Sequence, residues 1–476
     1  MSLSRRVSRN ALGQIAGRLY TSALAFVITA LVLPRTMSGE LFGIFAFHHT
    51  LWQLLNNVLD FGTGTVVIRE SSRRRSEAGS LIGMLVTTKA LLATAGVLVL
   101  VAVAWFGEGS SARFLLLALA APLLLAHAPA AANVIFHVDM RFGPAVLASA
   151  LGQSVWLLGT LAMAFAGVVE PALYIAAFGL GIATNALLSW RWAKPLVSVE
   201  LKPDPSSLRA LWKESWPAGV SLTMASVYFY IDALMLRPLV GEVATGHYKA
   251  AYSVMTFALM VPVLVSNVLY PIYARLWERG AEALRPFFGR SLATLAAFGL
   301  CVAATLPVVA RDVMAIVFEA PFLDAAPTLA TLSLAIGLVF CTYPHVLLLL
   351  AAGHQRTMMW VSVTAAAFNV IANWVLIPEH GMLGAAVTTV LTELLVLVGA
   401  ALAGRRLTGL SAGFANWTRP LLAAGLAAAA AWWLVPLLDE SQHLLRLGAA
   451  LALGVAGVFA AGVLPVDLGT EEGAPE

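Results

Sequence analysis

Four ionisable side chains fall inside long apolar stretches of the 476-residue sequence: Arg18, Lys89, Asp232 and Glu393. A charge is costly within a membrane, so such side chains face protein or a water-filled cavity. They commonly mark a pathway for an ion or for a charged substrate. These four residues are therefore the first candidates for function.

Arg18 lies about two helical turns into the first apolar stretch, roughly 12 Å deep at ~1.5 Å per residue. It belongs to a polar stripe in which every fourth residue is polar: Asn10, Gln14, Arg18 and Ser22. A guanidinium that faces a cavity can bind a diphosphate through two parallel hydrogen bonds, with Gln14 beside it. Alternatively, Arg18 pairs with a carboxylate or extends to the lipid headgroups.

A second polar stripe lies within the next apolar stretch. Its members are spaced by three and four, which places them on one helix face: His49, Gln53, Asn56 or Asn57, and Asp60. A cavity wall of this kind offers hydrogen bonds to a sugar, and His49, Gln53 and Asn57 are its candidate contacts. The alternative is hydrogen bonding that holds neighbouring helices together. Asp60 is expected at the cytoplasmic end, capping the loop beside Arg69.

Lys89 and several tyrosines are further candidates for substrate binding. Lys89 can contact a phosphate or pair with a carboxylate. Tyr248, Tyr252 and Thr256 share one helix face, and Tyr228 shares another with Asp232. Aromatic faces can stack on sugar rings, whereas interface anchoring and packing are equally ordinary uses of tyrosine.

Asp232 and Glu393 are the candidates for binding a coupling proton or sodium ion. Asp232 has the alternative of an ion pair with Arg18 or Arg237. Glu393 follows Thr389 by one turn and has the same two interpretations, ion coupling or a structural contact.

The sequence predicts no catalytic or metal site. Five histidines lack metal-ligand spacing with acidic neighbours: His48, His49, His127, His137 and His345. A Gly-Lys-Ser/Thr phosphate loop is missing, so no cofactor and no built-in ATPase are expected. Cys301 and Cys341 lie in apolar stretches, as small buried side chains do.

Composition predicts an all-α polytopic membrane protein. Hydrophobic residues make up 60% of the chain and charged residues 11%, against about 25% charged in soluble proteins, and the mean hydropathy is +0.85. A span needs roughly 20 apolar residues. About fourteen are predicted: 10–33, 41–61, 80–105, 113–136, 145–169, 171–192, 216–238, 246–270, 288–310, 328–352, 357–377, 381–403, 419–438 and 444–464.

The basic residues predict the orientation. Most of the 29 lysines and arginines fall on one side of the alternating spans, which the positive-inside rule makes the cytoplasmic side. Both termini are then cytoplasmic, in a bacterial inner membrane. The Arg73–Arg75 run has the same explanation. A sequence pI of 9.2 points to anionic lipid headgroups, and no nucleic acid is expected.

A faint internal repeat predicts the domain organisation. A helix exit followed by a Gly-Glu turn and a second glycine occurs at 33–46 and again at 236–250. The offset of six spans predicts two lobes related by an axis along the membrane normal. The expected parts are a six-helix lobe 1–195, a cytoplasmic linker 196–215, a six-helix lobe 216–404, two further transmembrane helices in 405–465, and a disordered acidic tail 466–476.

Four segments, in the same order along the chain, resemble the polysaccharide transporters (O-antigen and exopolysaccharide flippases) of the multidrug/oligosaccharidyl-lipid/polysaccharide exporter superfamily. The four segments are 60–70, 231–252, 348–356 and 369–386, and the first of them begins with Asp-Phe-Gly-Thr-Gly. The resemblance covers nearly the whole chain. Its motifs are specific as an ordered set, and none is diagnostic alone.

This resemblance implies a two-lobed alternating-access transporter and a polyprenyl-diphosphate-linked oligosaccharide as cargo. The last two spans would border a groove for the lipid tail. Other partners are membrane lipid and a polysaccharide polymerase. The competing readings are a lipid II flippase or a cation-coupled multidrug exporter of the same fold, a membrane enzyme of polysaccharide assembly, and a non-transporting scaffold. The outward loops are short for such an enzyme.

Overall fold

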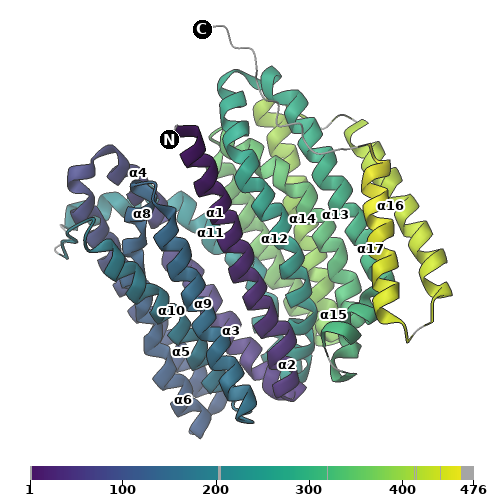
Figure 1. Cartoon of the computed structure of the whole chain (residues 1–476), viewed down its shortest axis with the longest axis horizontal. Coiled ribbons are helices and arrows are strands. Elements are labelled where there is room, and N and C mark those ends of the chain that lie inside the picture. Colours follow the sequence, from purple (N-terminus) through teal and green to yellow (C-terminus); the bar gives the residue numbers. More distant parts are fainter. Residues whose placement is uncertain are drawn as a thin grey trace. The chain divides into compact units, whose positions relative to one another are not determined.

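The computed structural model describes the backbone of residues 3–201, 205–318, 320–411, 413, 415–439 and 441–462 (Figure 1). Every regular element in these ranges is a helix, which confirms the all-α prediction. An apolar backbone in lipid must satisfy its own hydrogen bonds, and a helix does so within one segment. The Asn10 side chain and the tail 466–476 lie outside the described residues.

The spans agree with the prediction of about fourteen. Twelve helical stretches of the described chain are long and apolar enough to cross a membrane. One of them, α15, covers 54 residues and is interrupted at Gly381 (φ 57°, ψ −137°), so it holds two spans. The more polar α3 adds a further helix of 22 residues. The chain is therefore a multi-pass membrane protein.

The helices have the following bounds: α1 Leu3–Phe26, α2 Leu33–Thr36, α3 Gly39–Asp60, α4 Thr63–Arg73, α5 Ala78–Glu108, α6 Ala112–Ala120, α7 His127–Ala130, α8 Val134–Val138, α9 Phe142–Phe165, α10 Pro171–Ala193, α11 Pro205–Val240, α12 Glu242–Glu278, α13 Ala281–Val317, α14 Ala326–Ala351, α15 Gln355–Thr408, α16 Ala415–Leu434 and α17 His443–Ala460. A π-helix, Val27–Val32, joins α1 to α2.

The predicted span 113–136 is confirmed as the helical stretch Ala112–Val138, but it is not one regular helix. 3₁₀ turns separate α6, α7 and α8, and Pro122 and Pro129 remove backbone donors there. Helices also occupy parts of the segments between the predicted spans. The segment 62–79 contains α4, α11 begins at Pro205 within the predicted linker 196–215, and α12 and α13 extend into 271–287.

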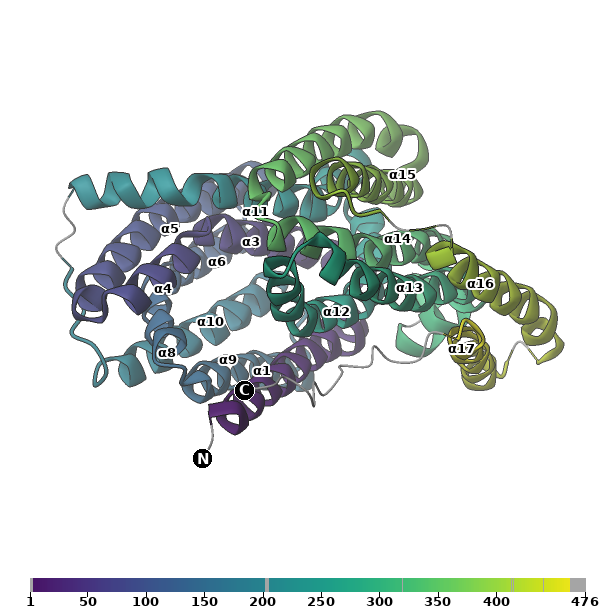
Figure 2. The ribbon, with the colours of Figure 1, turned by 90° about the horizontal axis from the view of Figure 1, so that it is seen from above.

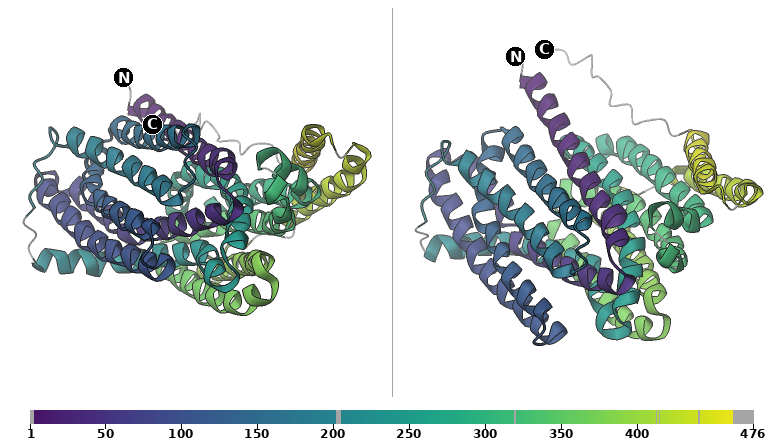
Figure 3. Two further views of the ribbon diagram at one scale, coloured as in Figure 1. Left: turned by 90° about the horizontal axis from the view of Figure 1, so that it is seen from below. Right: turned by 60° about the horizontal axis from the view of Figure 1, so that its bottom comes forward.

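The chain forms two compact units. Unit 1 comprises Met1–Phe257 and Ser362–Ala385, and unit 2 comprises Ala258–Val361 and Ala386–Glu476. Within unit 1, α9 lies between α1 and α10 (Figure 2). Within unit 2, α16 and α17 pack against each other and against α13, and Figure 3 shows these two yellow helices side by side.

The internal repeat has a structural counterpart in unit 1, where α3 and α12 approach closely. A Cβ atom at Gly43 would collide with the carbonyl oxygen of Glu242, and one at Gly246 would collide with that of Gly39. Each copy of the repeat thus places a glycine against the backbone of the other copy. Two elements related by a twofold axis make reciprocal contacts of this kind.

Candidate functional site

Several of the predicted site residues line three cavities of unit 1. We name these the α1 cavity, the Lys249 cavity and the Asp60 cavity. Their volumes are about 220, 190 and 300 Å³ respectively. Gln14 and Arg18 line the first, His49 and Gln53 the second, and Asn57 and Tyr228 the third.

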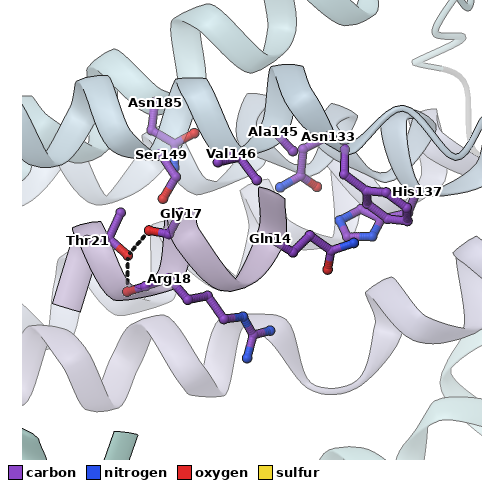
Figure 4. A pocket seen from close by; sticks show the side chains of 11 residues that line it. Gln14, Gly17, Arg18, Thr21, Asn133, His137, Ala145, Val146, Ser149 and Asn185 are labelled. Carbon is purple, nitrogen blue, oxygen red and sulfur yellow. Dashed lines mark hydrogen bonds between the residues drawn. The ribbon is translucent and has the colours of Figure 1, made fainter. Parts of the chain in front are cut away.

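The α1 cavity is lined by residues of α1, α9 and α10, and by α8 with the 3₁₀ turn that precedes it. Its lining is mostly polar or small: Gln14, Gly17, Arg18, Thr21, Asn133, His137, Phe142, Ala145, Val146, Ser149 and Asn185. The Arg18 side chain is exposed, and its guanidinium extends away from Asn185 and Ser149 (Figure 4). Among the described side chains Arg18 has no carboxylate partner, so its charge remains available to an anion.

The Lys249 cavity is built from α1, the π-helix, α3, α9 and α12. Its lining combines hydroxyls, amides and aromatic rings around one cation: Ser22, Ala25, Phe26, Thr29, His49, Gln53, Trp156, Lys249, Ser253, Thr256 and Phe257. Thr29 belongs to the π-helix, and such interruptions of a helix occur frequently at functional sites.

Lys249 is buried, with 8% of its surface exposed. Its ammonium lies 3.5 Å from the Thr50 hydroxyl, a long contact with a neutral group. Among the described residues no carboxylate lies within 4 Å of the Lys249 ammonium. Buried charges in proteins are normally paired, so the cavity holds an uncompensated positive charge.

Two aromatic side chains beside Lys249 also have unused polar atoms. His49 and Trp156 stack with ring centroids 5.4 Å apart. His49 Nδ1 and Trp156 Nε1 are both buried, and neither has a hydrogen-bond partner within the described part of the chain. His49 Nε2 lies 3.3 Å from the Gln53 amide nitrogen. Buried polar atoms without a partner are uncommon in native proteins, so His49 Nδ1 and Trp156 Nε1 mark the wall of the cavity as a candidate ligand site.

The Asp60 cavity joins the end of α3 to α11, with Asn57, Asp60, Tyr228 and Tyr230 in its lining. Lys89 donates to Asp60 Oδ1 at 2.8 Å, so Lys89 is paired with a carboxylate, one of the two alternatives for it. Asp60 does not sit against Arg69 as expected. Arg69 instead pairs with Glu70 and Glu214.

Tyr252 is buried inside the protein. Its hydroxyl donates to the Phe229 carbonyl oxygen at 2.5 Å, and its ring stacks on Tyr248 at 5.5 Å. Only 5% of its surface is exposed, so in this arrangement the ring packs between helices.

Asp232 lies in a buried cluster of oxygen-bearing side chains. Its carboxylate accepts from the Tyr248 hydroxyl and from the Asn373 amide, both at 2.9 Å. The Asn373 amide also donates to Asn369 Oδ1 at 2.9 Å, while Asn373 Oδ1 is buried and has no hydrogen-bond partner among the described residues. The expected alternative pair with Arg237 is wrong, because Arg237 binds Glu108 and Glu242. Glu393 is likewise buried, in the part of α15 that belongs to unit 2.

Lys249 is the functional candidate that sequence reasoning missed. The predicted span began at residue 246, which placed Lys249 within one turn of the end of the span, whereas α12 begins at Glu242 and buries it two turns inside. A signal was present: Lys249, Ser253 and Thr256 are spaced by four and three, as one polar face of a helix requires.

Comparison with known proteins gives a consistent family assignment. The model of the polysaccharide biosynthesis protein family matches residues 7–277. The probable low-salt glycan biosynthesis flippase Agl15 of Haloferax volcanii is 21% identical over 81% of each chain. An uncharacterised membrane protein of Methanocaldococcus jannaschii is 29% identical over 34% of this chain, and the match spans about a third (32%) of that relative's length.

Solved structures show the same fold. The lipid II flippase MurJ in an inward closed conformation superposes with a TM-score of 0.73 at 13% identity, covering 94% of this chain and 97% of that one. An inward-facing multidrug resistance MATE family transporter of the MOP superfamily gives a TM-score of 0.65 at 15% identity, covering 84% and 98%. At these identities the likeness establishes the fold, that of the MOP-superfamily transporters.

Proposed function

Because the chain belongs to the polysaccharide biosynthesis protein family, we propose that it is a flippase for polyprenyl-diphosphate-linked oligosaccharide. The cargo would move from the cytoplasmic to the outer leaflet by alternating access. This assigns the chain to transport and not to bond-forming chemistry. Agl15, described as a probable glycan biosynthesis flippase, supports the cargo class.

The observation that carries this proposal is the buried, uncompensated charge of Lys249. A diphosphate is the anionic part of the proposed cargo, and a lysine ammonium binds phosphate as a point charge. His49, Gln53 and Trp156 can then serve the sugars or the phosphate oxygens. Arg18 in the α1 cavity gives a second, exposed cation that can attract the headgroup before it reaches Lys249.

In the proposed cycle the headgroup enters from the cytoplasm while the prenyl tail stays in lipid. Lys249 offsets the charge of the diphosphate, so that the cargo need not carry bare charge through the membrane core. The two predicted lobes, 1–195 and 216–404, then rock about the site and reopen it outward. Both termini would lie in the cytoplasm of a bacterial inner membrane, as the basic residues predict.

Asp232 is the proposed site for the coupling ion, with Asn373 and Asn369 beside it. Carboxylate and amide oxygens suit sodium, and the Asp232 carboxylate can alternatively take a proton. An Asp232→Asn variant is expected to flip cargo without acceleration by an imposed gradient, and testing sodium and proton gradients separately identifies the ion. Glu393 remains a prediction for the same role, and so does an association with a polysaccharide polymerase.

Proteoliposomes test the proposed cargo directly. The purified chain is reconstituted with fluorescent polyprenyl-diphosphate oligosaccharides, with lipid II, or with a cationic drug. The oligosaccharides are expected to move between the leaflets faster than lipid II does. Transfer of lipid II alone would favour the lipid II flippase reading, since both cargoes carry a diphosphate. Export of the drug alone would reject the flippase proposal.

A further inference from the structure

Six charged or titratable side chains, from five helices and the residue that precedes α10, meet at one end of the unit 1 helices. We name this group the Glu108 network: His48, Glu108, Arg113, Glu170, Arg237 and Glu242. Under the predicted orientation, this end faces away from the cytoplasm. None of its members was a candidate for substrate binding or for ion coupling.

Glu108, at the C-terminus of α5, is the centre of the network. Its Oε1 accepts from Arg237 Nη2 at 2.6 Å, and its Oε2 accepts from Arg113 Nη1 at 3.2 Å. His48 Nε2 lies 3.3 Å from both Glu108 Oε1 and Arg237 Nη1. The side chains of Glu108 and Arg237 are only 5% and 10% exposed, so water screens their attraction weakly.

The network joins helices on either side of the 196–215 connection. His48, Glu108, Arg113 and Glu170 precede it, whereas Arg237 and Glu242 follow it. Within the described part of unit 1, one other ion pair crosses this connection, Arg69–Glu214, and its side chains are 46% and 48% exposed. Glu108–Arg237 is therefore the buried ion pair that joins the two sides of this connection, and we call it the crossing contact.

Each partner of the crossing contact has a second partner on its own side. Glu108 also binds Arg113, which is itself held by Glu170 at 2.9 Å. Arg237 also binds Glu242, the first residue of α12, at 3.2 Å. Removing the partner of a buried charge is strongly destabilising. Here the crossing contact can break without leaving either charge alone, so its breakage is comparatively inexpensive.

We propose that the Glu108–Arg237 contact is a reversible latch that holds the outer end of the transport path closed. It rests on the proposed alternating-access function. When the two sides part, Glu108 stays with Arg113 and Arg237 stays with Glu242, and the same pairs are ready to meet again. A contact that only stabilised the fold would not need a retained partner on each side.

Accessibility labelling tests the latch. Thr256, an exposed residue of the Lys249 cavity, becomes the reporter through Thr256→Cys, with Cys301 and Cys341 changed to serine. A membrane-impermeant thiol reagent is added to right-side-out vesicles, without cargo, from the side that bears Glu108. Glu108→Gln is expected to raise the labelling rate about tenfold or more, because a minor state typically has a population of about 0.1–10%.

Two matched variants test whether the labelling rate changes in the direction that the latch predicts. Glu170→Gln breaks a contact on one side only, so the labelling rate should stay near that of the parent. Glu242→Gln leaves Arg237 dependent on Glu108 alone, so opening becomes costlier and the rate should fall below that of the parent. The elution volume in size-exclusion chromatography and the thermal unfolding curve check that each variant is folded.

The latch is overturned if Glu108→Gln leaves the labelling rate unchanged, or if Glu242→Gln raises it as Glu108→Gln does. Cargo flipping is measured separately on wild type and on the same three variants with Thr256 retained. An intact labelling pattern with no flipping of any lipid-linked oligosaccharide would reject the proposed cargo and keep the latch. Normal flipping with no response of the labelling would reject the latch and keep the cargo.

Discussion

The Glu108 network and the Lys249 cavity place positive charge in the same unit under opposite conditions. In the network, each arginine contacts at least two carboxylates, at 2.6 to 3.2 Å. In the cavity, Lys249 is buried without any carboxylate within 4 Å in the described chain. Burial alone therefore does not distinguish a structural charge from a functional one.

The difference lies in whether the protein itself supplies the counter-charge. A cation surrounded by carboxylates is neutralised in the fold, so its loss should weaken the structure. A buried cation without a carboxylate costs stability and is tolerated where an external anion uses it. Four predictions sharpen this contrast, from the largest expected effect to the smallest.

Removing the Lys249 charge should have the largest effect on transport. Lys249→Met is expected to lower the flipping rate about 100-fold, since losing one buried charge–charge contact costs roughly 3 kcal/mol. Lys249→Arg keeps the charge and should retain a measurable rate. Lys194→Ala, which removes an exposed lysine of the same unit, is the control and should leave the rate unchanged. A normal rate for Lys249→Met would remove Lys249 from the cargo site.

Removing the central carboxylate of the network should instead weaken the fold. Glu108→Gln is expected to lower the free energy of unfolding by about 2 kcal/mol, because Arg237 and Arg113 each lose a charged hydrogen bond but keep another carboxylate. Thermal unfolding in detergent measures the change. An unchanged melting temperature would show that these pairs do not stabilise unit 1.

Lys249→Met should change stability in the opposite direction. Replacing a buried, unpaired ammonium by an apolar side chain of similar length is expected to raise the free energy of unfolding by about 1 kcal/mol. The same thermal measurement serves, now with an increase in melting temperature. A decrease like that of Glu108→Gln would mean that Lys249 is a structural charge.

Arg18→Ala should have the smallest effect. Its side chain is exposed, so water and salt screen its contribution, and a loss of about 1 kcal/mol or less corresponds to roughly fivefold in the flipping rate. Flipping at low and high ionic strength checks the reason, because the difference from the parent should shrink with salt. A loss as deep as that of Lys249→Met would reverse the order of the two cations.

The fold was largely predictable because a single physical rule governs it. Apolar stretches of spanning length must be helical in lipid, and basic loops alternate between them. Local exceptions were less visible. The stretch that contains Pro122 and Pro129 spans the membrane with 3₁₀ turns inside it, and α4 is too polar to be recognised by its hydropathy.

The site was predictable only where one helix carried the whole signal. The stripes with Gln14 and Arg18 and with His49 and Gln53 do line cavities. Lys249 was missed because its depth depends on where α12 begins. The Glu108–Arg237 contact joins residues 129 apart in sequence, a separation that no helical periodicity reports.

The most direct test of the central claim is calorimetric binding of a water-soluble sugar diphosphate to the detergent-solubilised protein. Wild type should bind it, and Lys249→Met should bind it at least about 100-fold more weakly although the variant is the more stable fold. Equal affinity in the two proteins would contradict the assignment of Lys249 as the counter-charge of the cargo.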